Sequence, residues 1–228
     1  MGYPRHVGII MDGNRRFAQN NSQLPWKGHE AGSRKLYDVL EWCEELGVTT
    51  LTVFAFSMQN FSRASDEVSE LMHIFENGLR DMKKKLRTFS EKGVRIRFIG
   101  RLHLFADPLS ALMQEISQAT ANHTTYVLNI AVGYGGREEI LDAVRALISS
   151  GVSSDEISEK LFSQYLSLSC EPELIIRTGG AIRTSNFLLW QSQYSEWMFI
   201  DTLWPNFSKE EFVSCLHEFS SRKRNFGK

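Results

Sequence analysis

The feature that most constrains the fold is an alternation of short apolar runs with longer segments of helical period. Six runs have the length and the β-branched or aromatic content of strands. They are His6–Met11, Thr50–Phe56, Val94–Ile99, Tyr126–Val132, Glu173–Ile176 and Trp197–Ile200. Because helical segments separate them, the pattern predicts an α/β fold with a mostly parallel sheet and helices packed on it.

Three helical segments are the clearest. One runs from Asp66 to about Phe89, with apolar residues spaced by three and four, and two more follow Gly136 and Ser208. The Ser- and Asp-rich stretch 149–154 has the length of a loop between helices, and no repeat or low-complexity tract occurs. We therefore expect one domain over residues 1–228.

Composition excludes several kinds of partner and location. Lys and Arg number 26 against 27 Asp and Glu, a net charge of −1, whereas non-specific nucleic-acid binding usually needs a basic excess. Cys43, Cys170 and Cys215 show no pairing pattern, which is typical of reduced thiols in the cytosol. No apolar run approaches the ~20 residues of a membrane helix. We expect a cytoplasmic protein that binds no nucleic acid.

The first expected strand runs directly into a polar loop, Asp12-Gly13-Asn14-Arg15-Arg16. Gly13 permits a sharp turn and a close approach of backbone N–H groups to a ligand. Arg16 can form paired hydrogen bonds with phosphate oxygens, and the Asp12 carboxylate suits Mg²⁺. The alternative is that Asp12 caps the next helix and the arginines form a solvated surface. This loop alone does not separate the two interpretations.

A second strand-end loop favours anion binding. The strand Glu173–Ile176 is followed by Arg177-Thr178-Gly179-Gly180, by Arg183 and Ser185, and by an expected apolar helix over Phe187–Trp190. N–H groups at a helix start, together with guanidinium groups, form a phosphate cradle. A structural Gly-Gly turn with incidental arginines does not explain why cations gather at a second strand end. Because parallel strands end at one edge of a sheet, two phosphorylated groups should bind near each other.

Motifs for nucleotides and for clustered metal ions are missing. The chain has no GxxxxGK[ST] and no DDxxD pair, and Gly133-Tyr134-Gly135-Gly136 lacks the full dinucleotide fingerprint. These absences argue against a kinase and against a Rossmann dehydrogenase.

Further motifs occur in a fixed order from His6 to Gly227. Besides the two loops they include Gly28-His29, Phe56-Ser57, Asn60-Phe61-Ser62-Arg63 with Glu67, Tyr134-Gly135-Gly136-Arg137, Ser185-Asn186-Phe187-Leu188-Leu189-Trp190-Gln191, Glu196 and Trp204-Pro205. With these motifs the chain resembles the cis-prenyltransferases, the family of undecaprenyl and dehydrodolichyl diphosphate synthases. The resemblance covers nearly the whole chain.

The resemblance implies a homodimer with a central parallel sheet of about six strands, flanking helices and an elongated hydrophobic tunnel. It implies a Mg²⁺-dependent prenyltransferase that condenses an allylic prenyl diphosphate with isopentenyl diphosphate and releases diphosphate. A metal and guanidinium groups stabilise the departing diphosphate, and the carbocation left behind needs a dry apolar wall. Candidates for this wall and for the tunnel lining are Phe54, Phe56, Phe61, Met72, Phe75 and Leu79.

The same resemblance assigns residues to roles. Asp12 and Asn14 would be catalytic, and Asp12 and Glu196 would bind the metal. The expected allylic diphosphate site comprises Gly13, Asn14, Arg15, Arg16, His29, Ser57, Asn60 and Arg63. The expected acceptor diphosphate site comprises Arg177, Arg183 and Ser185. Long prenyl products also give the Lys83–Lys85 run a reason to touch a membrane surface, although a solvated helix face is the simpler interpretation.

Four positions depart from the family pattern: Ala181 replaces a glutamate, Pro25 an arginine, Gly133 an asparagine, and Asn225 a C-terminal arginine. Three of these changes fall near the diphosphates, so two alternatives stay open. One is an irregular condensation of two allylic diphosphates, and the other is a non-catalytic subunit of a heteromeric enzyme. Retention of the charged loop residues favours an enzyme. Product length and the proton-abstracting base are not defined by the sequence.

Overall fold

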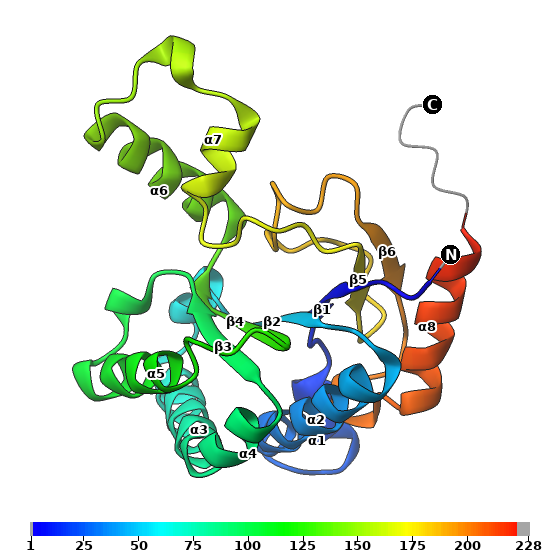
Figure 1. The fold of residues 1–228 in the computed structure, drawn as a ribbon. Helices are drawn as coiled ribbons and strands as arrows, with labels where there is room; N and C mark the ends of the chain where they lie inside the picture. Colours follow the sequence, from blue (N-terminus) through cyan, green and yellow to red (C-terminus); the bar gives the residue numbers. More distant parts are fainter. Residues whose placement is uncertain (1, 223–228) are drawn as a thin grey trace.

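The computed structural model describes residues 2–222, and in them a six-stranded sheet forms the centre of the molecule (Figure 1). The strand order is β3-β4-β2-β1-β5-β6, and every neighbouring pair is parallel. The predicted parallel sheet is therefore confirmed. The strands are β1 His6–Ile10, β2 Thr50–Ser57, β3 Val94–Ile99, β4 Tyr126–Tyr134, β5 Leu174–Arg177 and β6 Glu196–Phe199.

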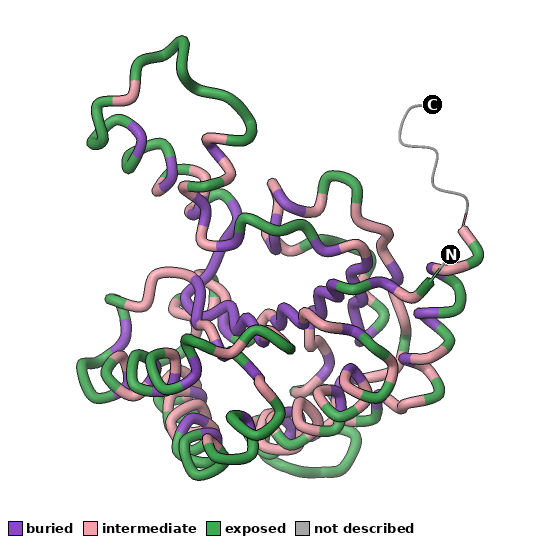
Figure 2. The backbone as a smooth tube through the Cα atoms, in the orientation of Figure 1, coloured by how far each residue is buried: buried purple, intermediate pink, exposed green. Residues whose placement is uncertain are grey.

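Helices connect the strands and cover the sheet. They are α1 Asn14–Asn20, α2 Pro25–Leu46, α3 Ser65–Lys84, α4 Leu86–Glu91, α5 Asp107–Ala119, α6 Gly136–Ser149, α7 Glu159–Gln164 and α8 Lys209–Ser221. Helices α6 and α7 project away from the sheet as an arm, and most of this arm is exposed (Figures 1 and 2). None of the helices within residues 2–222 has both the length and the hydrophobicity of a membrane span.

Two helix predictions are corrected. The segment Asp66–Phe89 is not one helix, because it breaks at Lys85, whose ammonium lies 3.6 Å from the ring centroid of Tyr37. The expected helix over Phe187–Trp190 does not form. Asn186 and Leu188 have φ values of 63° and 45°, a left-handed conformation that interrupts a right-handed helix. Phe187 and Leu188 are buried in a turn segment instead, and Leu189 and Trp190 are half-buried.

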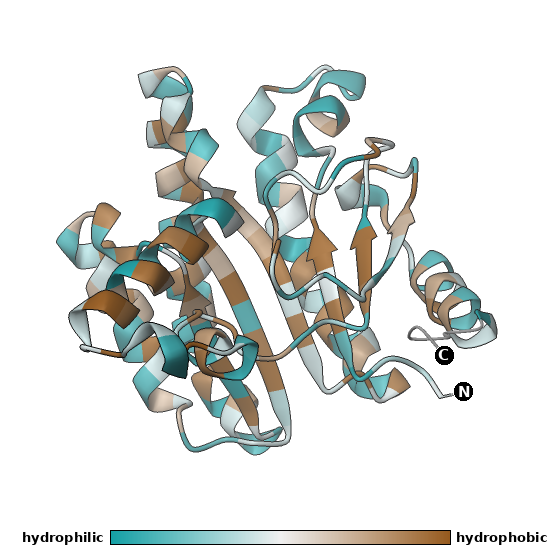
Figure 3. Ribbon diagram, turned by 90° about the horizontal axis from the view of Figure 1, so that it is seen from above, coloured by the Kyte–Doolittle hydropathy of each residue, from teal (hydrophilic) through white to brown (hydrophobic). Residues whose placement is uncertain are grey.

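Apolar residues fill both sides of the sheet, and they are concentrated along the central strands (Figure 3). The expected wall of Phe54, Phe56 and Phe61 is split between these sides. Phe56 packs on Phe61 with ring centroids 4.9 Å apart, whereas Phe54 stacks on Phe187. The cause is a register shift between β2 and β4 from Phe54 to Phe56, which breaks the two-residue alternation of side chains.

Candidate active site

A cleft of about 740 Å³ lies at the carboxyl edge of the sheet, where β1, β2 and β5 end. Ile10 pairs with Phe54 on one side and with Arg177 on the other, so the loops after these strands start at the same level. The predicted metal ligand Asp12 lines this cleft, and so do all residues predicted for the two diphosphate sites: Gly13, Asn14, Arg15, Arg16, His29, Ser57, Asn60, Arg63, Arg177, Arg183 and Ser185.

Arg177 holds the two predicted loops together. Its Nη2 donates to Asp12 Oδ2 at 2.7 Å, and its Nη1 donates to Ser185 Oγ at 2.6 Å and to the carbonyl oxygen of Arg183 at 2.7 Å. The side chain is only 4% exposed, and its Nε has no hydrogen-bond partner within residues 2–222. A buried guanidinium fixed by these contacts presents its charge to the cleft in one orientation.

Glycine is required where the loop after β1 meets residues 178–186, which we call the β5 loop. Gly179 has φ +86°, and a Cβ there would lie 2.7 Å from Arg16 Nη2 and 3.0 Å from the Asp12 carbonyl carbon. Gly13 has φ +109°, and its Cβ would lie 2.9 Å from the backbone of Leu203. A side chain at Gly179 would force the two loops apart, and one at Gly13 would clash with Leu203, so both glycines are needed to bring the cations and the carboxylate into one site.

Asn14 and His29 lie where the cleft adjoins an apolar pocket. Asn14 Oδ1 and His29 Nε2 are both buried without a hydrogen-bond partner in the described part of the chain. Burial, reinforced by Arg63 and Arg15, lowers the pKa of His29 to about 4, so its imidazole is neutral near pH 7. Unpartnered buried polar atoms cost free energy, and a ligand's polar groups would satisfy them.

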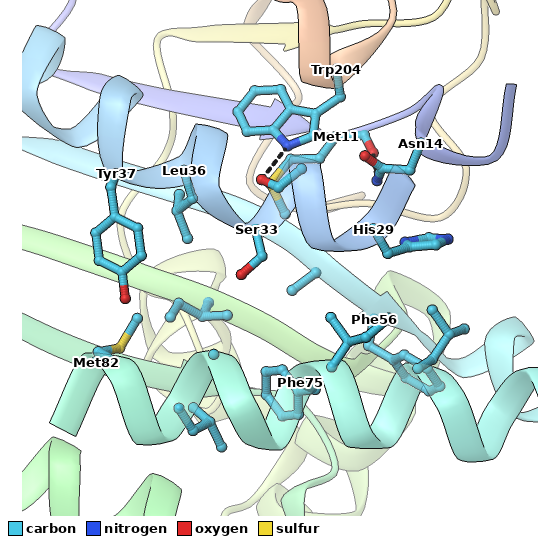
Figure 4. A pocket seen from close by; sticks show the side chains of 17 residues that line it. Met11, Asn14, His29, Ser33, Leu36, Tyr37, Phe56, Phe75, Met82 and Trp204 are labelled. Atoms are coloured by element: carbon cyan, nitrogen blue, oxygen red, sulfur yellow. Dashed lines mark hydrogen bonds between the residues drawn. The ribbon is translucent and has the colours of Figure 1, made fainter. Parts of the chain in front are cut away.

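The apolar pocket has a volume of about 130 Å³ and lies between α2, α3 and β2. Figure 4 shows Asn14 and His29 toward one end and Tyr37 with Met82 toward the other. The predicted lining residues Phe56, Phe75 and Leu79 contribute, whereas Met72 does not line it. A second cavity of about 220 Å³ continues beyond Tyr37, which lines both spaces. Two apolar cavities that share Tyr37 are thus present within residues 2–222, and the continuous tunnel stays a prediction.

Glu196, predicted to bind the metal, lies at the other end of the strands from Asp12. Glu196 pairs with Leu174 at the start of β5, whereas Asp12 lies beyond the carboxyl ends of the strands. Its Oε2 instead accepts a hydrogen bond from Arg222 Nη1 at 2.6 Å. Within the described residues the two carboxylates thus lie at opposite ends of the strands, and the metal role of Glu196 stays a prediction. No described residues form a cluster of three or more metal-ligating His, Cys, Asp or Glu side chains.

The four departures from the family pattern lie in different places. Ala181 lines the cleft, and Pro25 is the first residue of α2. Gly133 has φ +55° and lies against Phe105. Asn225 lies outside the described residues. The predicted phosphate cradle at a helix start after Asn186 is also wrong, because the segment forms no helix, and the cations themselves supply the charge there.

The sequence did not predict the residues that bind the backbone carbonyl oxygen of Asp12. Its carbonyl oxygen accepts hydrogen bonds from Thr178 Oγ1 at 2.7 Å and from the Trp204 backbone N–H at 3.0 Å. The Trp204 indole in turn donates to the carbonyl oxygen of Gly32 at 2.8 Å (Figure 4). Both residues belong to motifs quoted above, but nothing in the local pattern indicates that they contact Asp12.

Two cationic loops around one carboxylate, opening onto an apolar pocket, define a site for diphosphates that carry apolar chains. The family model described as undecaprenyl diphosphate synthase matches residues 10–227, and the chain belongs to this prenyltransferase family. The predicted resemblance is confirmed, and the chain is thereby an enzyme of the cis-prenyltransferase class.

Similar proteins agree over the full length. A tritrans,polycis-undecaprenyl-diphosphate synthase (geranylgeranyl-diphosphate specific) of Pyrococcus horikoshii is 46% identical, with 99% of this chain and 87% of that protein covered. An isoprenyl transferase of Thermus thermophilus is 45% identical over 99% of this chain and 89% of its own length.

Among solved structures, lavandulyl diphosphate synthase of Lavandula x intermedia, in complex with dimethylallyl diphosphate, has a TM-score of 0.93 at 32% identity, with 99% of both chains covered. An undecaprenyl diphosphate synthase of Campylobacter jejuni has a TM-score of 0.83 at 33% identity over 100% of both chains.

Proposed function

We propose that this enzyme transfers the prenyl group of an allylic diphosphate to isopentenyl diphosphate, forming a cis-prenyl diphosphate and releasing diphosphate. The observation that carries the proposal is the shared cleft, in which two cationic loops flank Asp12 and an apolar pocket adjoins them. The relatives named undecaprenyl-diphosphate synthase and isoprenyl transferase, at 46% and 45% identity, support the same reaction.

The residues around the cleft fit Mg²⁺ bound together with a diphosphate. Asp12 is a partly exposed carboxylate whose Oδ1 lies 3.5 Å from Arg16 Nη2 and faces the cleft. Mg²⁺ usually binds proteins through one or two carboxylates plus substrate phosphates. When bound, the ion would neutralise charge that develops on the departing diphosphate.

Different side chains of the cleft and the pocket would bind the two diphosphates and the hydrocarbon chain. Arg16, Arg63 and the neutral imidazole of His29 line the cleft and would hold the allylic diphosphate by charge-assisted and neutral hydrogen bonds. Arg177, Arg183 and Ser185 line the same cleft and would hold the acceptor diphosphate. The apolar pocket takes the hydrocarbon chain and keeps water away from the cation that forms.

A second candidate is the irregular condensation of two allylic diphosphates. It is favoured by the 0.93 TM-score to lavandulyl diphosphate synthase and by Ala181, which places no carboxylate in the cleft. Both candidates use the same donor site, so they differ only in the acceptor.

One assay separates these candidates. Purified protein with Mg²⁺ is given labelled isopentenyl diphosphate and, in separate reactions, dimethylallyl, farnesyl or geranylgeranyl diphosphate, and the products are resolved by chromatography. We expect labelled products longer than the donor. A further reaction holds dimethylallyl diphosphate without isopentenyl diphosphate, and a condensed product from it would establish the irregular reaction. No product with any donor would favour the non-catalytic alternative and overturn the proposal.

We also propose that the enzyme is a homodimer in which a second copy covers α6. The side chains of Leu141, Val144 and Ile148 form an apolar stripe on this projecting helix and are 52%, 39% and 73% exposed. Light scattering should give the mass of a dimer for the natural chain and of a monomer for Ile148→Glu. An unchanged dimer in that variant would exclude this stripe as the interface.

A further inference from the structure

Asn186 joins the β5 loop to the first turn of α6. Its carbonyl oxygen accepts from the Gly136 N–H at 2.7 Å, and its Oδ1 accepts from the Arg137 N–H at 2.9 Å. Its Nδ2 donates to Glu138 Oε2 at 2.9 Å. The first N–H groups of a helix lack intrahelical partners, and Gly135 at the helix start supplies no side-chain cap. A residue from a distant part of the chain therefore caps α6.

The backbone around Asn186 is held in an unfavourable conformation. Ser185, Asn186 and Leu188 have φ values of 51°, 63° and 45°. Asparagine tolerates this left-handed region better than other residues with side chains, whereas serine and leucine adopt it only when surrounding contacts fix it. The contacts with α6 fix one end of this strained segment, and Arg177 fixes the other.

The Tyr134–Arg137 motif permits the close approach that these hydrogen bonds need. A Cβ on Gly135 would lie 2.6 Å from Asn186 Nδ2 and 2.1 Å from Glu138 Oε2. A Cβ on Gly136 would lie 2.8 Å from Leu189 Cγ. Glycine at both positions is thus required for the loop to reach the helix, which explains a motif that the diphosphate sites leave unused.

The hydrogen bonds continue from Asn186 into the cleft. The adjacent Ser185 accepts from Arg177 Nη1 at 2.6 Å, and Arg177 Nη2 donates to Asp12 Oδ2 at 2.7 Å. We propose that Asn186 is a positioning residue that holds Ser185 and Arg183 in the orientation needed to bind the acceptor diphosphate. This assignment rests on the proposed function, because it presumes that the β5 loop binds the acceptor.

The decisive variant is Asn186→Gly. Glycine adopts the left-handed backbone freely, so this change removes both side-chain hydrogen bonds without adding strain. We expect the KM for isopentenyl diphosphate to rise roughly three- to tenfold, the range for losing one or two hydrogen bonds. The KM for the allylic donor should stay within roughly twofold, because the donor site does not contact Asn186. Calorimetric titration with isopentenyl diphosphate alone should show the same weakening without turnover.

Glu138 provides a matched pair of variants outside the cleft. Glu138→Gln keeps an oxygen that can accept from Asn186 Nδ2 and should leave the acceptor KM unchanged, whereas Glu138→Ala should raise it less than Asn186→Gly does. Equal increases in the KM for donor and for acceptor in Asn186→Gly would indicate a purely structural role and overturn the proposal. An unchanged acceptor KM in Asn186→Gly would also overturn it. If the natural chain forms no prenyl product in this assay, the proposed function fails instead.

Discussion

Replacement of Tyr37 by alanine should lengthen the product. The Tyr37 ring lies between the apolar pocket of about 130 Å³ and the second cavity of about 220 Å³ and lines both. Burial, together with Asp81, raises the pKa of its hydroxyl to about 12, so the side chain is uncharged at any usual assay pH. Removing the ring should join the two cavities into one space for a hydrocarbon chain.

The size of the effect follows from helix geometry. Along α2 the rise from His29 to Tyr37 is about 12 Å, and from Tyr37 to Glu44 about a further 10 Å. Each isoprene unit adds four carbon–carbon bonds of about 1.5 Å and so advances a chain by less than about 6 Å. The second cavity therefore has room for about two more units, and Tyr37→Ala should shift the mean product length by that number.

The assay is chromatography of dephosphorylated products made from one donor and labelled isopentenyl diphosphate. Tyr37→Phe is the matched control, since it keeps the ring and should keep the natural product length. Lys85→Ala removes the cation above the ring but leaves the ring in place, so it should also leave the length unchanged. A normal product distribution from an active Tyr37→Ala enzyme would refute the reasoning.

Two further predictions concern charge and pH. Asp12→Asn keeps the shape of the side chain but loses the charge that pairs with Arg177 and would bind the proposed Mg²⁺, so kcat should fall by about two orders of magnitude or more. Kinetics at saturating Mg²⁺ check this, and full activity in the variant would exclude Asp12 from metal binding. Burial lowers the pKa of both His6 and His29 from 6.5 to about 4. The unfolded chain therefore binds protons first as pH falls below 6.5, and at pH 5 each imidazole should cost about 2 kcal/mol of stability. The melting temperature should therefore be lower at pH 5.0 than at pH 7.5, and this drop should be smaller in His29→Gln. A higher melting temperature at pH 5.0 would contradict the prediction.

The strands could be predicted because a parallel sheet covered on both sides needs nearly continuous apolar segments. The run at residues 126–132 is such a segment apart from Asn129. The run at 94–99 forms an edge strand and instead alternates apolar residues with Arg95 and Arg97. Apolar content alone led to the wrong prediction of a helix over residues 187–190, because a buried turn and a buried helix have the same composition. The turn is decided by contacts of Asn186 with α6, which a local pattern cannot show.

The site was predictable where its chemistry is local in the sequence. Asp12 and Arg177 each follow directly from an apolar strand, and strand direction alone brings them to one edge of the sheet. The same reasoning does not bring Glu196 to that edge, since Glu196 begins its strand instead of ending it. The placement of Phe54 opposite Phe56 depends on a register shift that no periodicity reveals.

The arm formed by α6 and α7 has a consequence for how activity depends on protein concentration. The helix that carries the exposed stripe is the same helix to which Asn186 anchors the β5 loop. If the second copy dissociates and α6 shifts, the hydrogen bonds of Asn186 would move the β5 loop, which includes Arg183. Dilution that separates the subunits should therefore weaken binding of the acceptor diphosphate at protein concentrations at which the sheet is still folded.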